Sequence, residues 1–259
     1  LYENQPNLST RTSGSMERQA YSTPTHLAYL AQELAGVTDQ TENFEITAGN
    51  GMLVTKGDPS KTTVNEIDGD RHGNLQDQGF TTTRMDATNL DVDPVFDSIT
   101  ANPPFGKITK TEVDGYPLKK LEHLIVAKAL KGMKDDGKAS FIIGGKHFND
   151  KGEMSGTNKV FLNWLHRHYN VVANIEIPGS EYKRQGAGFP VRLISVNGRK
   201  KAPEGVAPKG KEDYTIVKSV DEILPILKEI QSGKRSVAPG STEAVLPGED
   251  SAGSTPAEG

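Results

Sequence analysis

The sequence contains no cysteine, which excludes disulfides, thiolate metal ligands and a cysteine nucleophile. This absence fits a reducing compartment. No apolar run approaches the roughly 18 residues that a membrane-spanning helix needs. The N-terminus also lacks the charged region followed by an apolar stretch that marks a secretory signal. We therefore expect a cytoplasmic protein that has no membrane partner.

An excess of positive charge is also missing, because 30 Lys and Arg residues stand against 34 Asp and Glu residues, for a net charge of -4. This balance argues against a protein that coats nucleic acid by bulk charge, so any contact with a polynucleotide must be local. A basic rim beside the NPPF loop could provide this local contact with phosphates. Its candidate residues are Lys107, Lys110, Lys119, Lys120, Lys183 and Arg184. The same residues are equally compatible with solvated surface charge.

Residues at the spacing typical of metal ligands are missing as well. The 6 His residues are scattered, and only His166 and His168 lie close together in the sequence. Without cysteine or a suitable carboxylate spacing, we expect no metal site.

What the sequence does contain is an alternation of short β-rich runs and helical stretches. We expect strands at 43–47, 62–66, 81–85, 96–101, 139–144, 171–177 and 191–196, and helices at 25–35, 51–56, 70–78, 119–133 and 159–168. This alternation predicts a doubly wound α/β fold with a seven-stranded, mainly parallel sheet. The segment 178–190 has no room for a helix, so the last strand should be antiparallel.

The ends of the chain differ from this middle part in composition. We expect a polar arm at 1–20, a catalytic domain at 21–198, a linker at 199–212, a small strand-helix appendage at 213–231 and a disordered tail at 232–259. The chain begins with Leu1 rather than Met. Both a complete chain and a piece of a longer protein therefore stay open.

The first candidate ligand motif is FEITAGNGML at 44–53, where a strand runs into a glycine turn and then an expected helix. Gly49 and Gly51 let the backbone approach a ligand, and the helix N-terminus would supply free N–H groups. The next strand ends at Glu66, whose carboxylate can accept both hydroxyls of a ribose. We expect Asp68 and Asp70 to cap the following helix instead. Asp86, after the third strand, can accept a hydrogen bond from an adenine amino group.

The second motif is FDSITANPPFGK at 96–107, in which two prolines stiffen a loop at the carboxyl end of a strand. An amino group conjugated to a purine is a poor nucleophile. Acceptors for its two hydrogens would favour its nucleophilic form, and Asn102 and the carbonyl of Pro103 can supply them. Pro104 completes the rigid pair, and Phe105 offers a face on which a flipped base can stack.

In this order the motifs resemble the S-adenosylmethionine-dependent methyltransferases that act on DNA adenine N6. The similarity is to the gamma arrangement, in which the cofactor motif precedes NPPF, and to the modification subunits of type I restriction systems. YSTPTHLAYLA at 21–31, EITAGNG at 45–51, NEID at 65–68 and GAGFPVRLISVNG at 186–198 resemble further family motifs. The resemblance implies that Glu45 meets the methionine ammonium, that Ile67 packs on the adenine ring and that Phe189 helps to hold the target base.

The site that this resemblance implies can be stated residue by residue. The expected catalytic residues are Asn102, Pro103, Pro104 and Phe105. The expected S-adenosylmethionine contacts are Thr23, Glu45, Thr47, Ala48, Gly49, Asn50, Gly51, Glu66, Ile67, Asp86, Ala87 and Asn102. The expected substrate contacts are Phe105, Phe189 and Lys107.

The expected reaction is direct methylation of a flipped adenine in DNA, which needs no metal. The segment after 198 is too short and polar for a target-recognition domain, so we expect specificity to come from another subunit or segment. Three alternatives stay open: methylation of an RNA base amino group, methylation of a protein glutamine, and a degenerate methyltransferase-fold module in a larger phage or mobile-element protein.

Overall fold

The structure, a computed structural model, describes residues 22–145, 147–149, 151–181 and 188–234. The expected polar arm, most of the expected disordered tail, and Lys183 and Arg184 of the expected basic rim lie outside the described residues. Within them, no helix is long and apolar enough to cross a membrane.

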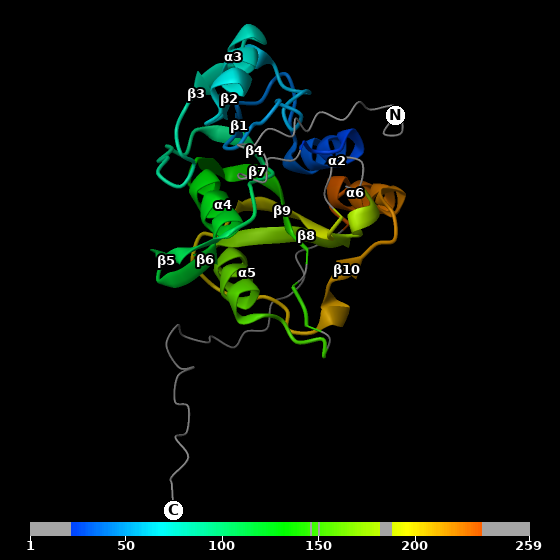
Figure 1. The fold of residues 1–259 in the computed structure, drawn as a ribbon. Helices are drawn as coiled ribbons and strands as arrows, with labels where there is room; N and C mark the ends of the chain where they lie inside the picture. The colour runs from blue at the N-terminus through cyan, green and yellow to red at the C-terminus, as the bar shows by residue number, and fades with distance from the viewer. Residues whose placement is uncertain (1–21, 146, 150, 182–187, 235–259) are drawn as a thin grey trace, which may run out of the picture.

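The fold is built on one eight-stranded sheet, shown in Figure 1. Its strands, in spatial order, are β10 (Thr215–Ile216), β8 (Tyr169–Ile177), β9 (Val191–Arg199), β7 (Met133–Gly144), β4 (Phe96–Ala101), β1 (Asn43–Glu45), β2 (Thr62–Asn65) and β3 (Thr81–Thr83). The chain builds outward from β1 to β3 and then returns to place β4 on the other side of β1. The sheet therefore has a topological switch point between β1 and β4, where ligands bind in open α/β sheets.

The sheet is mostly parallel, as the alternation of strands and helices predicts. The pairs β1–β2, β1–β4, β2–β3, β4–β7 and β8–β10 are parallel. β9 lies between β7 and β8 and is antiparallel to both. The expected antiparallel final strand of the catalytic domain is thus confirmed, because 178–190 gives no room for a crossover helix.

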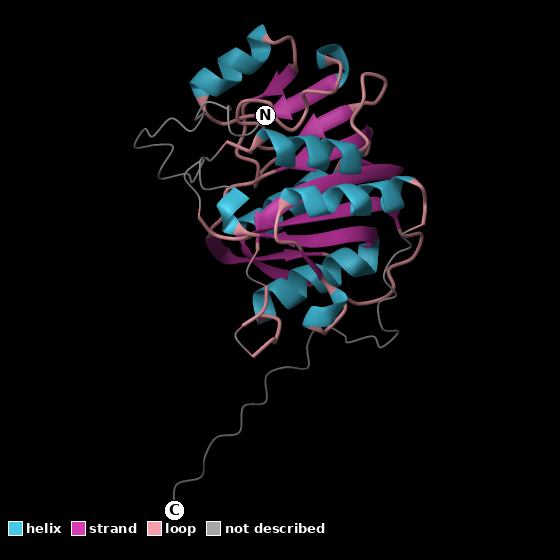
Figure 2. Cartoon of the chain, turned by 90° about the vertical axis from the view of Figure 1, so that its right-hand side faces the viewer, coloured by secondary structure: helices cyan, strands magenta, loops and turns pink. Residues whose placement is uncertain are grey.

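Helices cover both faces of the sheet (Figures 1 and 2). On one side lie α4 (Leu121–Lys131) and α5 (Gly156–His168), whose buried faces meet β4 and β7 in the larger hydrophobic cluster. On the other lie α2 (Thr25–Ala35) and α6 (Ile223–Gln231), which pack with residues of β8 and β9. α3 (Gly69–Asp77) follows β2 and begins at Asp68, whose carboxylate accepts the N–H groups of Asp70 and Arg71. The expected cap is confirmed for Asp68, whereas Asp70 lies in the first turn of the helix and does not cap it.

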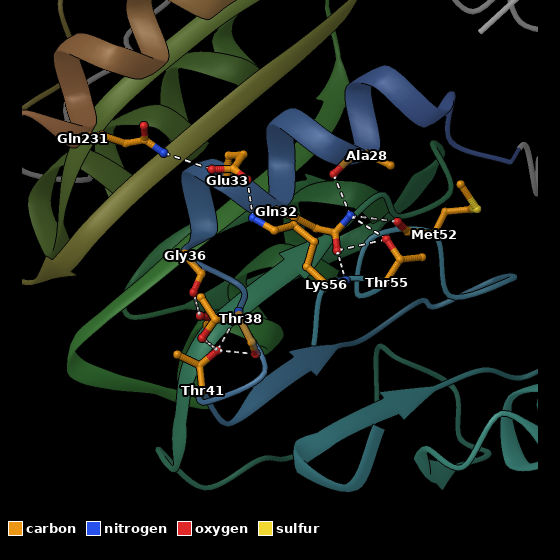
Figure 3. A network of polar contacts seen from close by, with 11 residues as sticks. Ala28, Gln32, Glu33, Gly36, Thr38, Thr41, Met52, Thr55, Lys56 and Gln231 are labelled. Carbon is orange, nitrogen blue, oxygen red and sulfur yellow. Dashed lines mark hydrogen bonds and ion pairs between the residues drawn. The ribbon is translucent and has the colours of Figure 1, made fainter. Parts of the chain in front are cut away.

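The sheet has eight strands rather than seven because the segment after the linker adds one. β10 pairs with β8, with Thr215 opposite Ile175. α6 then packs on α2, where the Gln231 amide donates to the Glu33 carboxylate at 3.0 Å (Figure 3). The strand and helix expected as an appendage thus extend the main sheet and cover part of one face.

A two-stranded hairpin, β5 (Lys107–Val113) and β6 (Tyr116–Lys120), follows directly after the NPPF segment. Our sequence analysis missed it and assigned Lys119 and Lys120 to a helix. Its turn is Asp114-Gly115, with φ of 49° and 81°. Asp-Gly between two strand-like runs is a strong hairpin signal, because both positions need positive φ.

The expected helix at 51–56 is wrong: this segment forms successive turns. Gly49 and Gly51 have φ of 57° and 75°, and the N–H of Gly51 donates to the carbonyl of Ala48 at 2.8 Å. Figure 3 shows that Gln32 of α2 binds this segment, since its amide donates to the Met52 carbonyl and accepts the Lys56 N–H. A helix-borne side chain thus replaces the hydrogen bonds that a helix here would have made internally.

Burial of His166 predicts acid sensitivity of the fold. The ring is 5% exposed, and burial, helped by the nearby Lys200 ammonium, lowers the pKa of His166 to about 4. The unfolded chain takes up this proton near pH 6.5, so the stability contributed by neutral His166 is complete above 6.5 and is lost as the pH falls toward 4. Denaturant unfolding should be measured at pH 7.5 and 5.0. The decrease in the free energy of unfolding between these two pH values should be about 2 kcal/mol smaller in His166→Asn than in the unmodified chain.

The control for this experiment is His72→Asn, on the partly exposed surface of α3. It should leave the pH-dependent loss unchanged. An equal loss in His166→Asn and in the unmodified chain would show that His166 does not carry the effect.

Candidate active site

The switch point brings the two sequence motifs together. Glu45 is the last residue of β1 and is paired with Thr100 of β4, two positions before Asn102. A cavity opens here at the carboxyl ends of the strands. It is lined by Ser22, Thr23, Glu45, Thr47, Ala48, Gly49, Asn50, Met52, Arg71 and Asn102. Seven of these were expected as ligand contacts, and the cavity is therefore the part of the site that our sequence analysis described best.

The other expected contacts lie outside this lining. Gly51 is in the same turn, and a Cβ there would come within 3.1 Å of Leu75. Ile67 is 45% exposed and follows β2, and Ala87 is buried beyond β3. Asp86 is exposed and accepts the Thr88 N–H at 2.9 Å and the Thr88 hydroxyl at 2.8 Å. Asp86 thus forms the local turn typical of this residue type.

Glu66 links the glycine turn to the start of α3. Its carboxylate accepts the Gly49 N–H at 2.8 Å through one oxygen and the Asp68 N–H at 2.8 Å through the other. A carboxylate has about four acceptor positions, so these two bonds leave capacity for two more donors. The sequence analysis did not anticipate that Glu66 fixes the glycine turn in this way. The carboxylate can still accept the two hydroxyls of a ribose through its remaining acceptor positions.

The carboxyl ends of β1, β2 and β3 are fastened together by Asn65. Its amide donates to the carbonyls of Ile46 and Met85, each at 3.0 Å, and accepts the Met85 N–H at 3.0 Å. The Thr83 hydroxyl donates to the same oxygen at 2.8 Å. Our sequence analysis did not single out Asn65, although it directly precedes Glu66.

Glu45 is the most unusual group in the cavity. It is 1% exposed, and its Oε2 atom has no hydrogen-bond partner in the part of the chain that the structure describes. Burial, and then the nearby Glu66 carboxylate, raise the pKa of Glu45 well above its ordinary value. Thr47 adds a second buried oxygen without a partner in the same cavity. Such atoms cost free energy unless they are hydrogen-bonded, so the cavity fits a ligand that brings donors, including a cationic one.

The NPPF loop approaches the cavity from β4. The Asn102 amide nitrogen donates to the Thr23 hydroxyl at 2.9 Å, which fixes the amide plane and leaves the oxygen as its acceptor end. Thr23 directly precedes Pro24, which is the N-cap residue of α2 and provides no side-chain cap. The Thr23 hydroxyl accepts the hydrogen bond from Asn102.

The far side of the loop carries two aromatic rings. Phe105 and Phe189 meet edge to face, with ring centroids 5.6 Å apart and an interplanar angle of 60°. Phe189 is 39% exposed, whereas Pro103 is buried. Lys107 begins β5 and is exposed. The structure therefore places together the two aromatic residues expected as substrate contacts from segments more than 80 positions apart in the sequence.

The loop is held from behind by Glu122 of α4. Its carboxylate is 3% exposed, accepts the Gly106 N–H at 3.1 Å and lies 3.6 Å from the Lys120 ammonium. Three residues that were not among the expected contacts, Ser22, Met52 and Arg71, line the cavity itself. Among the described residues, no group of three His, Asp or Glu side chains is arranged to hold a metal ion.

Comparisons with known proteins bear on the fold. No protein-family model and no curated protein matches the chain. Among solved structures, the modification subunit of a type I restriction enzyme from Vibrio vulnificus is 14% identical with a TM-score of 0.56, over 82% of this chain and 53% of that one. The M protein of the EcoKI type I restriction enzyme is 12% identical with a TM-score of 0.55, over 80% and 53%.

A third solved structure, from Listeria monocytogenes, is described as a class I S-adenosylmethionine-dependent methyltransferase. It is 15% identical with a TM-score of 0.53, over 88% of this chain and 73% of that one. The chain spans about half the length of the two restriction-enzyme subunits. Its α/β architecture is therefore the fold of these methyltransferases.

Proposed function

We propose that the chain binds S-adenosylmethionine in the switch-point cavity and transfers its methyl group to N6 of a flipped adenine in DNA. The observation that carries this proposal is that Asn102 lines the same cavity as the buried, unpartnered carboxyl of Glu45. A nucleophile-binding amide and a cation-binding acid at one switch point suit a reaction between an amino group and a sulfonium cofactor.

The cavity residues fit this cofactor by the chemistry of their donors and acceptors. Glu45 would accept the α-ammonium, Glu66 the ribose hydroxyls through its two remaining acceptor positions, and Asp86 the adenine amino group. Ile67, 45% exposed beyond β2, would give the adenine ring an apolar face. When bound, the cofactor supplies a methyl group on a sulfonium, which an amino group can accept directly.

The NPPF loop would prepare the amino nucleophile. We infer that the Asn102 oxygen and the Pro103 carbonyl accept the two N6 hydrogens, so that the nitrogen lone pair is less delocalised into the ring. The bond from the Asn102 amide nitrogen to Thr23 supports this assignment, because it fixes which end of the amide is the acceptor. Phe105 would stack on the flipped base, with Phe189 at its border.

DNA is the proposed substrate because of the sequence motifs and because two solved structures with this fold are subunits of type I restriction enzymes. Lys107, exposed two residues after Phe105, would contact a phosphate. We infer that a specificity subunit or a further segment selects the target sequence. A methylation assay can distinguish DNA from the two alternative methyl acceptors, an RNA base and a protein glutamine.

That experiment incubates the full chain with tritiated S-adenosylmethionine and, in separate reactions, unmethylated genomic DNA, total RNA and a protein mixture. The chain should be in excess over acceptor sites, so that weak site selection does not hide transfer. We expect label in DNA. Label confined to RNA or protein contradicts the DNA assignment, and label in none of the three contradicts the proposed activity.

The hydrogen bond from Gly106 to Glu122 predicts a positioning role. Glu122→Ala should slow methyl transfer by on the order of 10- to 100-fold, because a displacement of about 1 Å in a catalytic loop can cost that much. Cofactor affinity should stay within a few-fold, since Glu122 does not line the cavity. Glu112→Ala is the matched control, because this exposed acid pairs only at the surface with Lys110 of the same hairpin. Equal rates in Glu122→Ala and the control would contradict the positioning role.

A further inference from the structure

Arg71 contributes a cation to the candidate cofactor cavity. It lies in the first turn of α3, where its backbone N–H is fixed by Asp68 at 3.2 Å. The residue lines the cavity together with Glu45 and Asn102. Among the described residues its guanidinium makes no hydrogen bond or ion pair. Arg71 is thus half-buried beside a cavity without a structural task in the fold.

Arg71 and Glu45 place a guanidinium and a carboxyl group at one cavity, and the two side chains are not paired with each other. Among the residues that the structure describes, Arg71 occurs in no ion pair and the Oε2 atom of Glu45 has no hydrogen-bond partner. A structural ion pair would have brought the two side chains into contact. A guanidinium and a buried carboxyl group around one cavity, each without a partner among the described residues, instead match a ligand that carries an anionic and a cationic group close together.

The amino acid end of the proposed cofactor has this property, since an ammonium and a carboxylate share one carbon. A guanidinium binds a carboxylate through two parallel N–H donors, and such charged hydrogen bonds are stronger than neutral ones. Arg71 also lies in the first turn of a helix, where a cation opposes the helix dipole and a ligand anion is favoured. Both features favour an anionic group beside Arg71.

We propose that Arg71 binds the α-carboxylate of the cofactor while Glu45, which lines the same cavity, accepts its α-ammonium. The inference rests on the proposed function, because it needs a cofactor with a methionine end. It adds a selectivity: the cavity recognises the zwitterion and so favours the intact cofactor and its thioether product over nucleosides that lack the amino acid end.

The test is calorimetric binding of three ligands that differ only at that end. They are S-adenosylhomocysteine, its decarboxylated analogue and 5′-methylthioadenosine, each titrated into the unmodified chain and Arg71→Ala. Arg71→Ala should weaken the binding of S-adenosylhomocysteine by about 10- to 100-fold. Its affinity for the other two ligands should stay within about two-fold of the affinity of the unmodified chain. In the unmodified chain, removal of the carboxylate from the ligand should cost a similar factor.

The matched control is Arg84→Ala. Arg84 lies next to the same region, but its side chain donates to the Ile67 carbonyl at 3.2 Å and does not line the cavity. It should bind all three ligands without loss of the carboxylate preference. The melting temperature of Arg71→Ala should stay close to that of the unmodified chain, because the side chain makes no hydrogen bond or ion pair with the described residues.

Where the unmodified chain binds the ligands, two results would overturn the assignment of Arg71. An equal loss for all three ligands indicates a general effect on the cavity, and no loss for any of them indicates a solvated side chain. If the unmodified chain binds none of the ligands, the proposed cofactor fails along with Arg71. Binding of all three with an unchanged preference in Arg71→Ala leaves the proposed function intact and removes only this inference.

Discussion

Asn102→Ala should lose methyl transfer by roughly two to three orders of magnitude and keep its affinity for the cofactor within a few-fold. The Asn102 oxygen is proposed to accept a hydrogen bond that strengthens as N6 becomes tetrahedral and positively charged. A contact that is stronger in the transition state affects the rate far more than ground-state binding. Single-turnover transfer and calorimetry on the same preparation measure both quantities.

Asn102→Asp is the finer version of this test. It keeps an acceptor at nearly the same volume, so it should retain more activity than Asn102→Ala. It also replaces the amide nitrogen that donates to Thr23, so Thr23→Val provides the control for loss of that contact alone. Transfer at the unmodified rate by Asn102→Ala would mean that the NPPF loop is not the catalytic loop.

Glu66→Ala should weaken cofactor binding by about 1.5 to 3 kcal/mol, or roughly 10- to 150-fold, the scale of hydrogen bonds to a charged group. The loss should be similar for S-adenosylhomocysteine and 5′-methylthioadenosine, because both carry the ribose that Glu66 is proposed to bind. This pattern differs from the one expected for Arg71→Ala, which depends on the carboxylate.

Glu66 also holds the backbone of Gly49 and Asp68, so its removal affects the fold as well. Glu66→Gln keeps the shape and one acceptor oxygen, and denaturant unfolding of both variants separates stability from affinity. A folded Glu66→Ala chain that binds both ligands with unchanged affinity would exclude Glu66 as the ribose acceptor.

The parts of the fold that could be predicted from sequence are those with a complete local signal. The helix Thr25–Ala35 has the expected bounds because its apolar residues recur at helical spacing. The strand Phe96–Ala101 has the expected bounds because it is apolar and ends at a double proline. The helix expected at 51–56 is wrong, and Gln32, distant in sequence, binds the Met52 carbonyl and the Lys56 N–H of this segment.

The candidate site divides in the same way. Glycine and proline constrain the backbone locally, so the glycine turn and the NPPF loop could be located from sequence. Glu122 could not be found, because nothing in its helix shows that it is buried against Gly106. Arg71 did leave a signal: a basic residue in the first helical turn is unfavourable beside the helix dipole, and such local departures occur at functional sites.

The central claim is tested most directly by identifying the atom that receives the methyl group. Unmethylated genomic DNA is incubated with the full chain in excess and S-adenosylmethionine, digested to nucleosides and analysed by mass spectrometry against standards. The account predicts N6-methyldeoxyadenosine, whose rate of formation falls by roughly two to three orders of magnitude in Asn102→Ala and is unchanged in Glu112→Ala. A methyl group on another base, or N6-methyldeoxyadenosine at the same level with Asn102→Ala, would contradict it.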